Sequence, residues 1–157
     1  MTKGAKPKMT EFEKYFITQS YGGYSNVAAD NRKKYTLPNC TAYAWSMFYY
    51  FHGQRKDKAS WAKRPRGNAN KIYEACKKEG SGFIVRKAVT ENSIACYNVG
   101  VNGHVIYIFY QQPDGKWLCG ESNYSGTRKN GKDIRYIVCD NPAVLYKGYQ
   151  GCVYDFT

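Results

Sequence analysis

The spacing of apolar residues divides the chain into an earlier part with helical periodicity and a later part with strand periodicity. Apolar positions fit helices from Cys40 to about Phe51 and from Ala69 to Cys76. After Gly80 the period changes to two, which predicts strands. We expect six of them, at Gly82–Ala88, Ile94–Tyr97, His104–Tyr110, Lys116–Gly120, Ile134–Cys139 and Cys152–Phe156. Because helices precede strands, the pattern predicts an α+β fold, with N-terminal helices packed on an antiparallel sheet of about six strands.

The third and fourth expected strands form a hairpin in the middle of this sheet. The stretch Val105–Phe109 is apolar on both faces, which is typical of a central strand. Gln112-Pro113-Asp114-Gly115 is a strong turn sequence between the two strands. The hairpin therefore places residues 118–122 opposite the early part of the strand that begins at His104.

The chain of 157 residues is long enough for one domain with its own core. We expect a flexible basic tail over residues 1–9 and a single catalytic domain over residues 10–157. Thr10–Glu13 fits a capping box that starts a short helix, and residues 25–39 form a polar loop. No apolar run reaches membrane-spanning length, and the basic residues 1–8 have no apolar stretch after them, so we do not expect them to be a secretory signal. We therefore expect synthesis in the cytoplasm, and release by another route if the protein acts outside the cell.

The cysteines predict a protein made in a reducing compartment. There are six, no CxxC pair and only two histidines, which argues strongly against a zinc finger or ribbon. Several cysteines stand within apolar, strand-like runs, so we expect reduced core thiols. The six are Cys40, Cys76, Cys96, Cys119, Cys139 and Cys152.

The charge predicts a polyanionic partner. The 24 Lys and Arg residues against 12 Asp and Glu residues give a formal net charge of +12. Nucleic acid, an anionic membrane and an anionic cell wall would all attract such a chain. Charge alone does not choose among them.

Cys40 is a candidate nucleophile because it stands at the expected start of a helix, after Pro38 and Asn39. The free N–H groups and the positive dipole end of a helix stabilise a thiolate, which is the reactive form of cysteine. The alternative is that Cys40 is a small buried hydrophobic residue, as most cysteines are.

Only one histidine is placed to serve as the base for Cys40. His52 follows it by twelve residues on the same helix, about 18 Å away, so we interpret His52 as a surface residue at the helix C-terminus. His104 opens the most apolar strand, which holds its imidazole at the rim of the sheet. The alternative is a strand-end histidine bonded to a loop carbonyl.

Glu121 and Asn123 are candidates to orient His104. Glu121 ends the strand that pairs with the His104 strand, and if that strand continues, the equal parity of Glu121 and Asn123 lets both face the imidazole. We expect a carboxylate or amide at Nδ1 of His104, where it would fix the tautomer and support the imidazolium. The alternative is a solvated glutamate at a strand end.

Four short segments follow one another along the chain in a defined order: Leu37–Trp45, Gly67–Ala69, Gly103–Val105 and Glu121–Gly126. With this set the chain resembles the CHAP domain, the cysteine, histidine-dependent amidohydrolase/peptidase of phage endolysins and bacterial wall hydrolases. The resemblance covers nearly the whole chain after about residue 20. It implies a papain-like α+β fold, with the cysteine at a helix N-terminus and the histidine on the sheet.

The resemblance also implies roles for individual residues. Cys40 would be the nucleophile and His104 the general base, with Glu121 orienting His104 and Asn123 as a further polar member. The oxyanion would be bound by the Cys40 backbone N–H and a second donor. Asn39 and Tyr24, in the polar loop before the cysteine, are the candidates for that donor or for substrate contacts.

The implied activity is that of an endolysin-like peptidoglycan hydrolase, a monomer that cuts an amide bond in bacterial cell-wall peptide. Its positive charge would hold it to anionic wall polymers.

Two stretches depart from the family pattern. Glu91–Cys96 lacks the Pro, Gly and Asp of the corresponding strand motif. Residues 31–36 are basic where some relatives carry acidic calcium ligands, so we expect no metal and no cofactor.

Two other classes of function remain open. A basic nucleic-acid-binding module with stacked aromatic residues would explain the charge and the sixteen tyrosines. It leaves Cys40, His104 and Glu121 as coincidence, and no nucleic-acid-binding motif is present, so we expect no nucleic-acid partner. An inactive wall-binding domain is the other alternative, and the intact set of candidate residues argues against it.

Overall fold

The computed structural model describes residues 40–52, 64–65, 67–122 and 134–157. The described helical elements are α3 (Cys40–Phe51), η2 (Ala69–Lys71), α5 (Ile72–Lys77) and η3 (Pro142–Val144). The described strands are β1 (Phe83–Arg86), β2 (Ser93–Tyr97), β3 (His104–Gln111), β4 (Trp117–Ser122), β5 (Ile134–Cys139) and β6 (Tyr149–Phe156). The expected tail, short helix and polar loop before Cys40 lie outside these residues.

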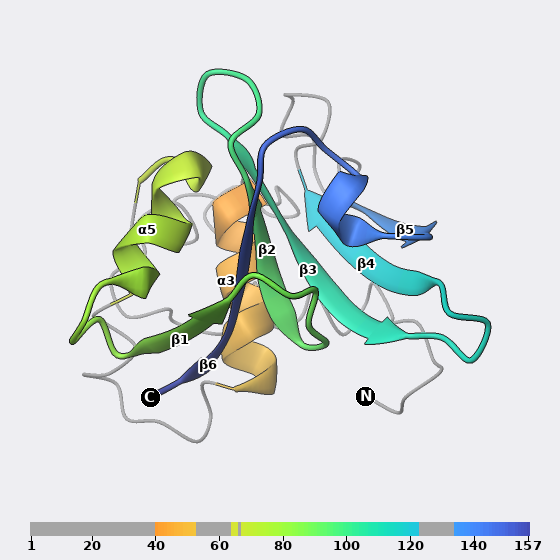
Figure 1. The fold of residues 1–157 in the computed structure, drawn as a ribbon, viewed down its shortest axis with the longest axis horizontal. Helices are drawn as coiled ribbons and strands as arrows, with labels where there is room; N and C mark the ends of the chain where they lie inside the picture. The colour runs from red at the N-terminus through yellow and green to blue at the C-terminus, as the bar shows by residue number, and fades with distance from the viewer. Residues whose placement is uncertain (1–39, 53–63, 66, 123–133) are drawn as a thin grey trace, which may run out of the picture.

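The six strands form one antiparallel sheet in the order β1-β6-β2-β3-β4-β5 (Figure 1). The expected α+β class and the six antiparallel strands are therefore confirmed. Strand β3 is buried at seven of its eight residues, as its continuous apolar pattern predicts. The last strand of the chain, β6, lies between β1 and β2, so the C-terminal residues complete the sheet.

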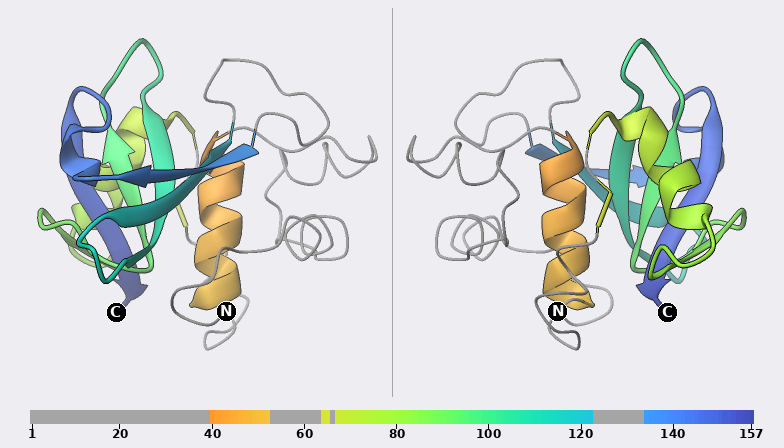
Figure 2. Two further views of the ribbon diagram at one scale, coloured as in Figure 1. Left: turned by 90° about the vertical axis from the view of Figure 1, so that its right-hand side faces the viewer. Right: turned by 90° about the vertical axis from the view of Figure 1, so that its left-hand side faces the viewer.

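The two faces of the sheet are covered differently. On one face, α3 and α5 pack on alternate residues of the strands, including Val105, Tyr107 and Phe109. On the other face, Ile106 and Ile108 belong to a second cluster. The residues that complete this second cluster are Ala95, Tyr97, Cys119, Cys152 and the partly buried Leu145, Tyr146 and Tyr149. Figure 2 shows α3 running along one side of the sheet and the segment around η3 on the other.

Helix α3 approaches the sheet closely where β4 has a glycine. A Cβ at Gly120 would lie 2.0 Å from the hydroxyl of Tyr43, so only glycine fits beneath this tyrosine. Tyr43, Trp45 and Phe48 are at most 1% exposed, which makes α3 the central helix of the core. This packing places the start of α3 beside the residue that precedes Glu121.

Several predicted boundaries shift in the structure. The second expected helix begins as the 3₁₀ turn η2, and α5 then spans only six residues. The last strand begins at Tyr149 rather than Cys152, because Tyr149 pairs with Tyr97 of β2 despite the polar and glycine residues that follow it. Local pattern does not show such pairing, since the partner strand lies some fifty residues earlier in the chain.

All six cysteines are free thiols, as expected for reduced core residues. Among the described residues, none of the helices has both the length and the apolar character needed to cross a membrane.

Candidate active site

Cys40 is the first residue of α3, as the sequence predicts. Its side chain is partly exposed and packs against the core cluster. The start of α3 lies at the same end of the sheet as the start of β3 and the end of β4 (Figures 1 and 2). Elements that are distant in sequence thereby bring a thiol, an imidazole and a carboxylate together.

His104 is held by a turn that is locked against η2. The preceding Gly103 has φ +75°, and a Cβ there would lie 2.5 Å from the backbone nitrogen of Asn70. The Asn70 N–H donates a 3.0 Å hydrogen bond to the carbonyl of Asn102. The Gly67–Ala69 segment thus leads into the element that fixes the position of the histidine. The side chain of His104 is consequently well packed, and the residue is 8% exposed.

Glu121 contacts the histidine as predicted, but at the other ring nitrogen. Nε2 of His104 lies 2.9 Å from Oε2 of Glu121, whereas the sequence interpretation placed the carboxylate at Nδ1. Strand register does not determine which nitrogen faces the partner, because this depends on the rotation of the imidazole. The side chain of Cys40 lies beside that of His104 and is the main group that raises the pKa of the imidazole.

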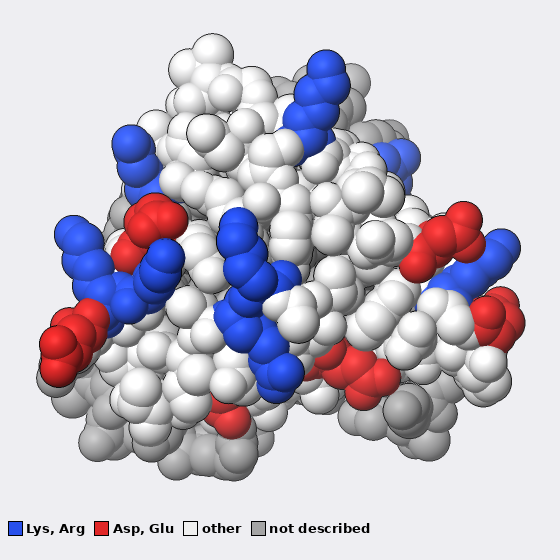
Figure 3. Space-filling model, viewed as in Figure 1, with Lys and Arg blue, Asp and Glu red and all other residues white. Residues whose placement is uncertain are grey.

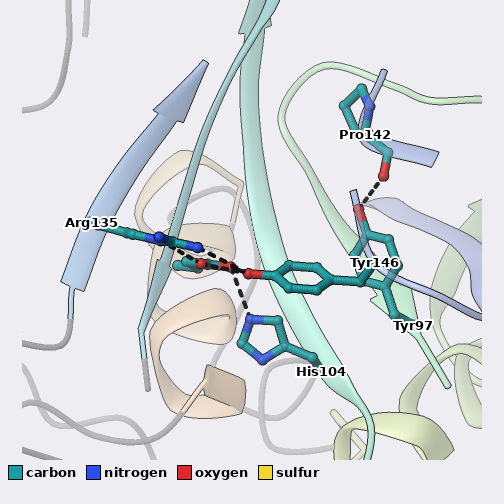
Figure 4. Close-up of polar contacts among 6 residues, drawn as sticks. Tyr97, His104, Arg135, Pro142 and Tyr146 are labelled. Carbon is teal, nitrogen blue, oxygen red and sulfur yellow. Dashed lines mark hydrogen bonds and ion pairs between the residues drawn. The ribbon is translucent and has the colours of Figure 1, made fainter. Parts of the chain in front are cut away.

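Glu121 has two further partners that the sequence analysis missed (Figure 4). Nε of Arg135 lies 2.8 Å from Oε1, and the hydroxyl of Tyr146 lies 2.7 Å from each carboxylate oxygen. Arg135 is directly opposite Glu121 in the pairing of β4 with β5. A correct register would have revealed this pair. Tyr146 follows η3, outside the strands, and no pattern in the sequence indicates its contact.

The electrostatics of the cluster favour an imidazolium beside a carboxylate. Burial lowers the pKa of His104, but its hydrogen bonds to Cys40 and Glu121 outweigh this and raise the pKa to about 9. Burial likewise raises the pKa of Glu121, and the hydrogen bonds from His104 and Tyr146 more than reverse it, so this pKa is lowered. At neutral pH the pair is therefore charged, with the proton on the imidazole.

This arrangement has the parts that nucleophilic acyl transfer needs. A partly exposed thiol at a helix N-terminus contacts an imidazole, and a buried carboxylate holds that imidazole from behind. The imidazolium can stabilise a thiolate and can give its proton to a leaving group.

His52 is correctly excluded from this cluster, but the interpretation of it as a surface residue is wrong. It follows the last residue of α3 and is only 8% exposed. Its Nε2–H donates a 2.7 Å hydrogen bond to the carbonyl of Asn92, and its ring packs 4.7 Å from that of Phe48. Long-range packing of the loop before β2 buries this end of the helix, which the charged residues after His52 do not reveal.

The remaining site candidates, Asn123, Asn39 and Tyr24, lie outside the described residues, as does the stretch 31–36. Within the described residues, no group of three or more His, Cys, Asp or Glu side chains could hold a metal ion. A scan of protein-family models finds no match to the chain, and a search of curated proteins finds none either.

Proposed function

We propose that the protein is a cysteine-dependent peptidoglycan hydrolase of the CHAP type with a papain-like fold. The observation that carries this proposal is the buried His104, which contacts Glu121 and lies beside Cys40 at the start of α3. A core cysteine needs no such partners, and a nucleic-acid-binding module would have no use for a buried carboxylate behind an imidazole. The placement of Cys40 at the start of α3, against an antiparallel sheet that carries His104, supports the papain-like assignment.

In the proposed reaction, the Cys40 thiolate attacks the carbonyl carbon of an amide in the wall peptide. A carbon–sulfur bond forms, and the oxyanion is bound by the Cys40 backbone N–H and a second donor, for which Asn39 and Tyr24 are the candidates. The His104 imidazolium then gives its proton to the leaving amine as the carbon–nitrogen bond breaks. Neutral His104 next takes a proton from water, which hydrolyses the thioester and restores the thiolate.

The positive charge of the chain supports a polyanionic partner, and in the proposed reaction that partner is the anionic wall. Nine of the 24 basic residues and seven of the 12 acidic residues lie in the described part, so this part carries a formal charge of only +2. Figure 3 shows both signs interspersed over one face of the molecule. The other +10 belongs to residues 1–39, 53–63, 66 and 123–133. Two of these segments adjoin Cys40 and Glu121 in sequence, which would favour an anionic polymer near the thiol.

Digestion of purified bacterial walls tests this proposal. We expect the protein to release soluble fragments that mass spectrometry shows to carry a new amino group and a new carboxylate, as amide hydrolysis requires. The same fragments distinguish the muramoyl–peptide amide from a bond within the peptide. Fragments cut only in the glycan strand, or the absence of fragments from walls of several species, would overturn the proposal. The rate should also fall with added salt, since ionic strength screens attraction to the wall.

A further inference from the structure

Glu121 is the least exposed member of the candidate site and its most heavily contacted one. The residue is 0% exposed, and its two carboxylate oxygens make hydrogen bonds with three different side chains. Oε2 faces His104, Oε1 faces Arg135, and the hydroxyl of Tyr146 reaches both oxygens. Figure 4 shows the guanidinium of Arg135, the phenol of Tyr146 and the imidazole of His104 converging from three different directions.

The proposed reaction makes a demand on this carboxylate that His104 alone does not meet. When His104 gives its proton to the leaving amine, the imidazole becomes neutral. If His104 were its only partner, Glu121 would then be a buried charge without a charged neighbour. Such a charge is costly, and burial would favour protonation of the carboxylate. A protonated Glu121 could no longer support the next imidazolium. Arg135 and Tyr146 supply donors to the carboxylate that do not depend on the state of His104.

Tyr146 is itself fixed in position by the sheet. Its ring packs edge-on against His104, with centroids 5.0 Å apart, and against Tyr97, with centroids 5.4 Å apart. The hydroxyl of Tyr97 donates to the carbonyl of Pro142 and ties η3 to the sheet (Figure 4). Burial and the hydrogen bond to Glu121 raise the pKa of Tyr146 to about 12, so the phenol remains a donor at neutral pH.

We propose that Arg135 and Tyr146 are positioning residues that keep Glu121 ionised and directed at His104 while the imidazole gains and loses its proton. Both residues act on the site through their hydrogen bonds to the Glu121 carboxylate. This inference rests on the proposed function, because the hydrolytic cycle is what removes the proton from His104.

Titration of Glu121 and His104 by NMR, in the full chain with labelled side chains, tests the inference without any substrate. Arg135→Gln should raise the midpoint of Glu121 by about one unit, the lower end of the effect of an adjacent opposite charge. Tyr146→Phe removes only the hydroxyl and should give a smaller rise. Arg135→Lys keeps the charge and should restore part of the shift.

Two matched variants control for general loss of packing. Tyr149→Phe removes a hydrogen-bonded phenol from the same cluster, since the Tyr149 hydroxyl donates to the carbonyl of Lys87. Arg86→Gln removes a guanidinium that lies over the ring of Tyr154. Both should leave the midpoints of Glu121 and His104 unchanged.

Unchanged midpoints in folded Arg135→Gln and Tyr146→Phe would overturn the inference. Where wild type hydrolyses walls, kcat should fall roughly tenfold in Arg135→Gln with KM unchanged, equivalent to about 1.4 kcal/mol. If wild type does not hydrolyse walls, the proposed function fails, and the midpoints still decide the role of the two residues.

Discussion

Helix α3 has a buried histidine near each of its ends, and both contact a carboxylate. His104 lies near the first residue of the helix and His52 follows its last residue, each 8% exposed. The partners differ. His104 contacts the fully buried Glu121 at 2.9 Å and also the Cys40 thiol, whereas Nδ1 of His52 lies 3.7 Å from the partly exposed Asp155.

Under the proposed function, this difference separates a histidine that transfers protons from one that fills a structural position. Nε2 of His52 is committed to the backbone carbonyl of Asn92, and its ring is packed on Phe48. His104 instead neighbours the Cys40 thiol and contacts a carboxylate that also accepts hydrogen bonds from Arg135 and Tyr146. Under the proposed function, burial beside a carboxylate does not by itself make a histidine catalytic, and the neighbouring Cys40 thiol makes the difference.

Replacing each histidine in turn tests the comparison most strongly. His104→Gln should lower the rate of wall hydrolysis by about 10² to 10⁴-fold, the usual contribution of general acid–base catalysis. His52→Gln should lower the free energy of unfolding by about 1 kcal/mol through its lost hydrogen bond, with little change in rate. Clearing assays and urea unfolding of both variants check this. Equal loss of activity in two folded variants would remove the distinction between the two histidines.

Changing the carboxylates should sharpen the same contrast. Glu121→Gln removes the charge behind His104, so we expect the rate to fall about a hundredfold. The pKa of His104 should fall from about 9, because the variant loses a charged hydrogen-bond partner. The alkaline limb of the pH–rate profile would then move to lower pH. A limb that stays in place would show that Glu121 does not govern the imidazolium.

The pH dependence of stability should also report on His104. Its folded pKa, about 9, lies above the ordinary value of 6.5, so protonation favours the folded state. This stabilisation is fully present below about pH 6.5 and is lost as the pH rises through about 9. We expect wild type to lose on the order of 2 kcal/mol more than His104→Gln between pH 6 and pH 10. Urea unfolding at both pH values measures this difference, and parallel losses would contradict it.

We expect the smallest change in stability and activity from replacing Asp155, the carboxylate that contacts His52. Asp155→Asn should change the free energy of unfolding by less than about 1 kcal/mol, because Asp155 is partly exposed and its contact with His52 is long. Wall hydrolysis should keep its rate and its pH profile. A shift of the alkaline limb in this variant would mean that the limb does not belong to His104.

The sequence predicts Cys40, His104 and Glu121 as site residues because a strong local signal marks each of them. Helical spacing gives the start of α3 at Cys40, and the turn before a continuous apolar strand gives His104 at the start of β3. The hairpin turn at Pro113 and Asp114 fixes the register that brings Glu121 near His104. Parity and register identify neighbours on a sheet, and this is as far as local pattern extends.

The parts that the sequence missed depend on contacts between distant segments. Tyr146 reaches Glu121 from a short segment after η3, whose position is set by the hydrogen bond from Tyr97 to Pro142. Arg135 follows an eleven-residue connection whose length does not determine the pairing of β4 with β5. The burial of His52 likewise depends on Asn92, forty residues later.

The most direct test of the central claim compares two cysteine variants in the digestion of purified walls. Cys40→Ala removes the proposed nucleophile, and Cys139→Ala removes another partly exposed thiol, on β5. We predict that Cys40→Ala releases no fragments above background, while Cys139→Ala and wild type release the same fragments at similar rates. Release of the wild-type fragments by folded Cys40→Ala would contradict a mechanism in which Cys40 attacks the amide and His104 and Glu121 support it.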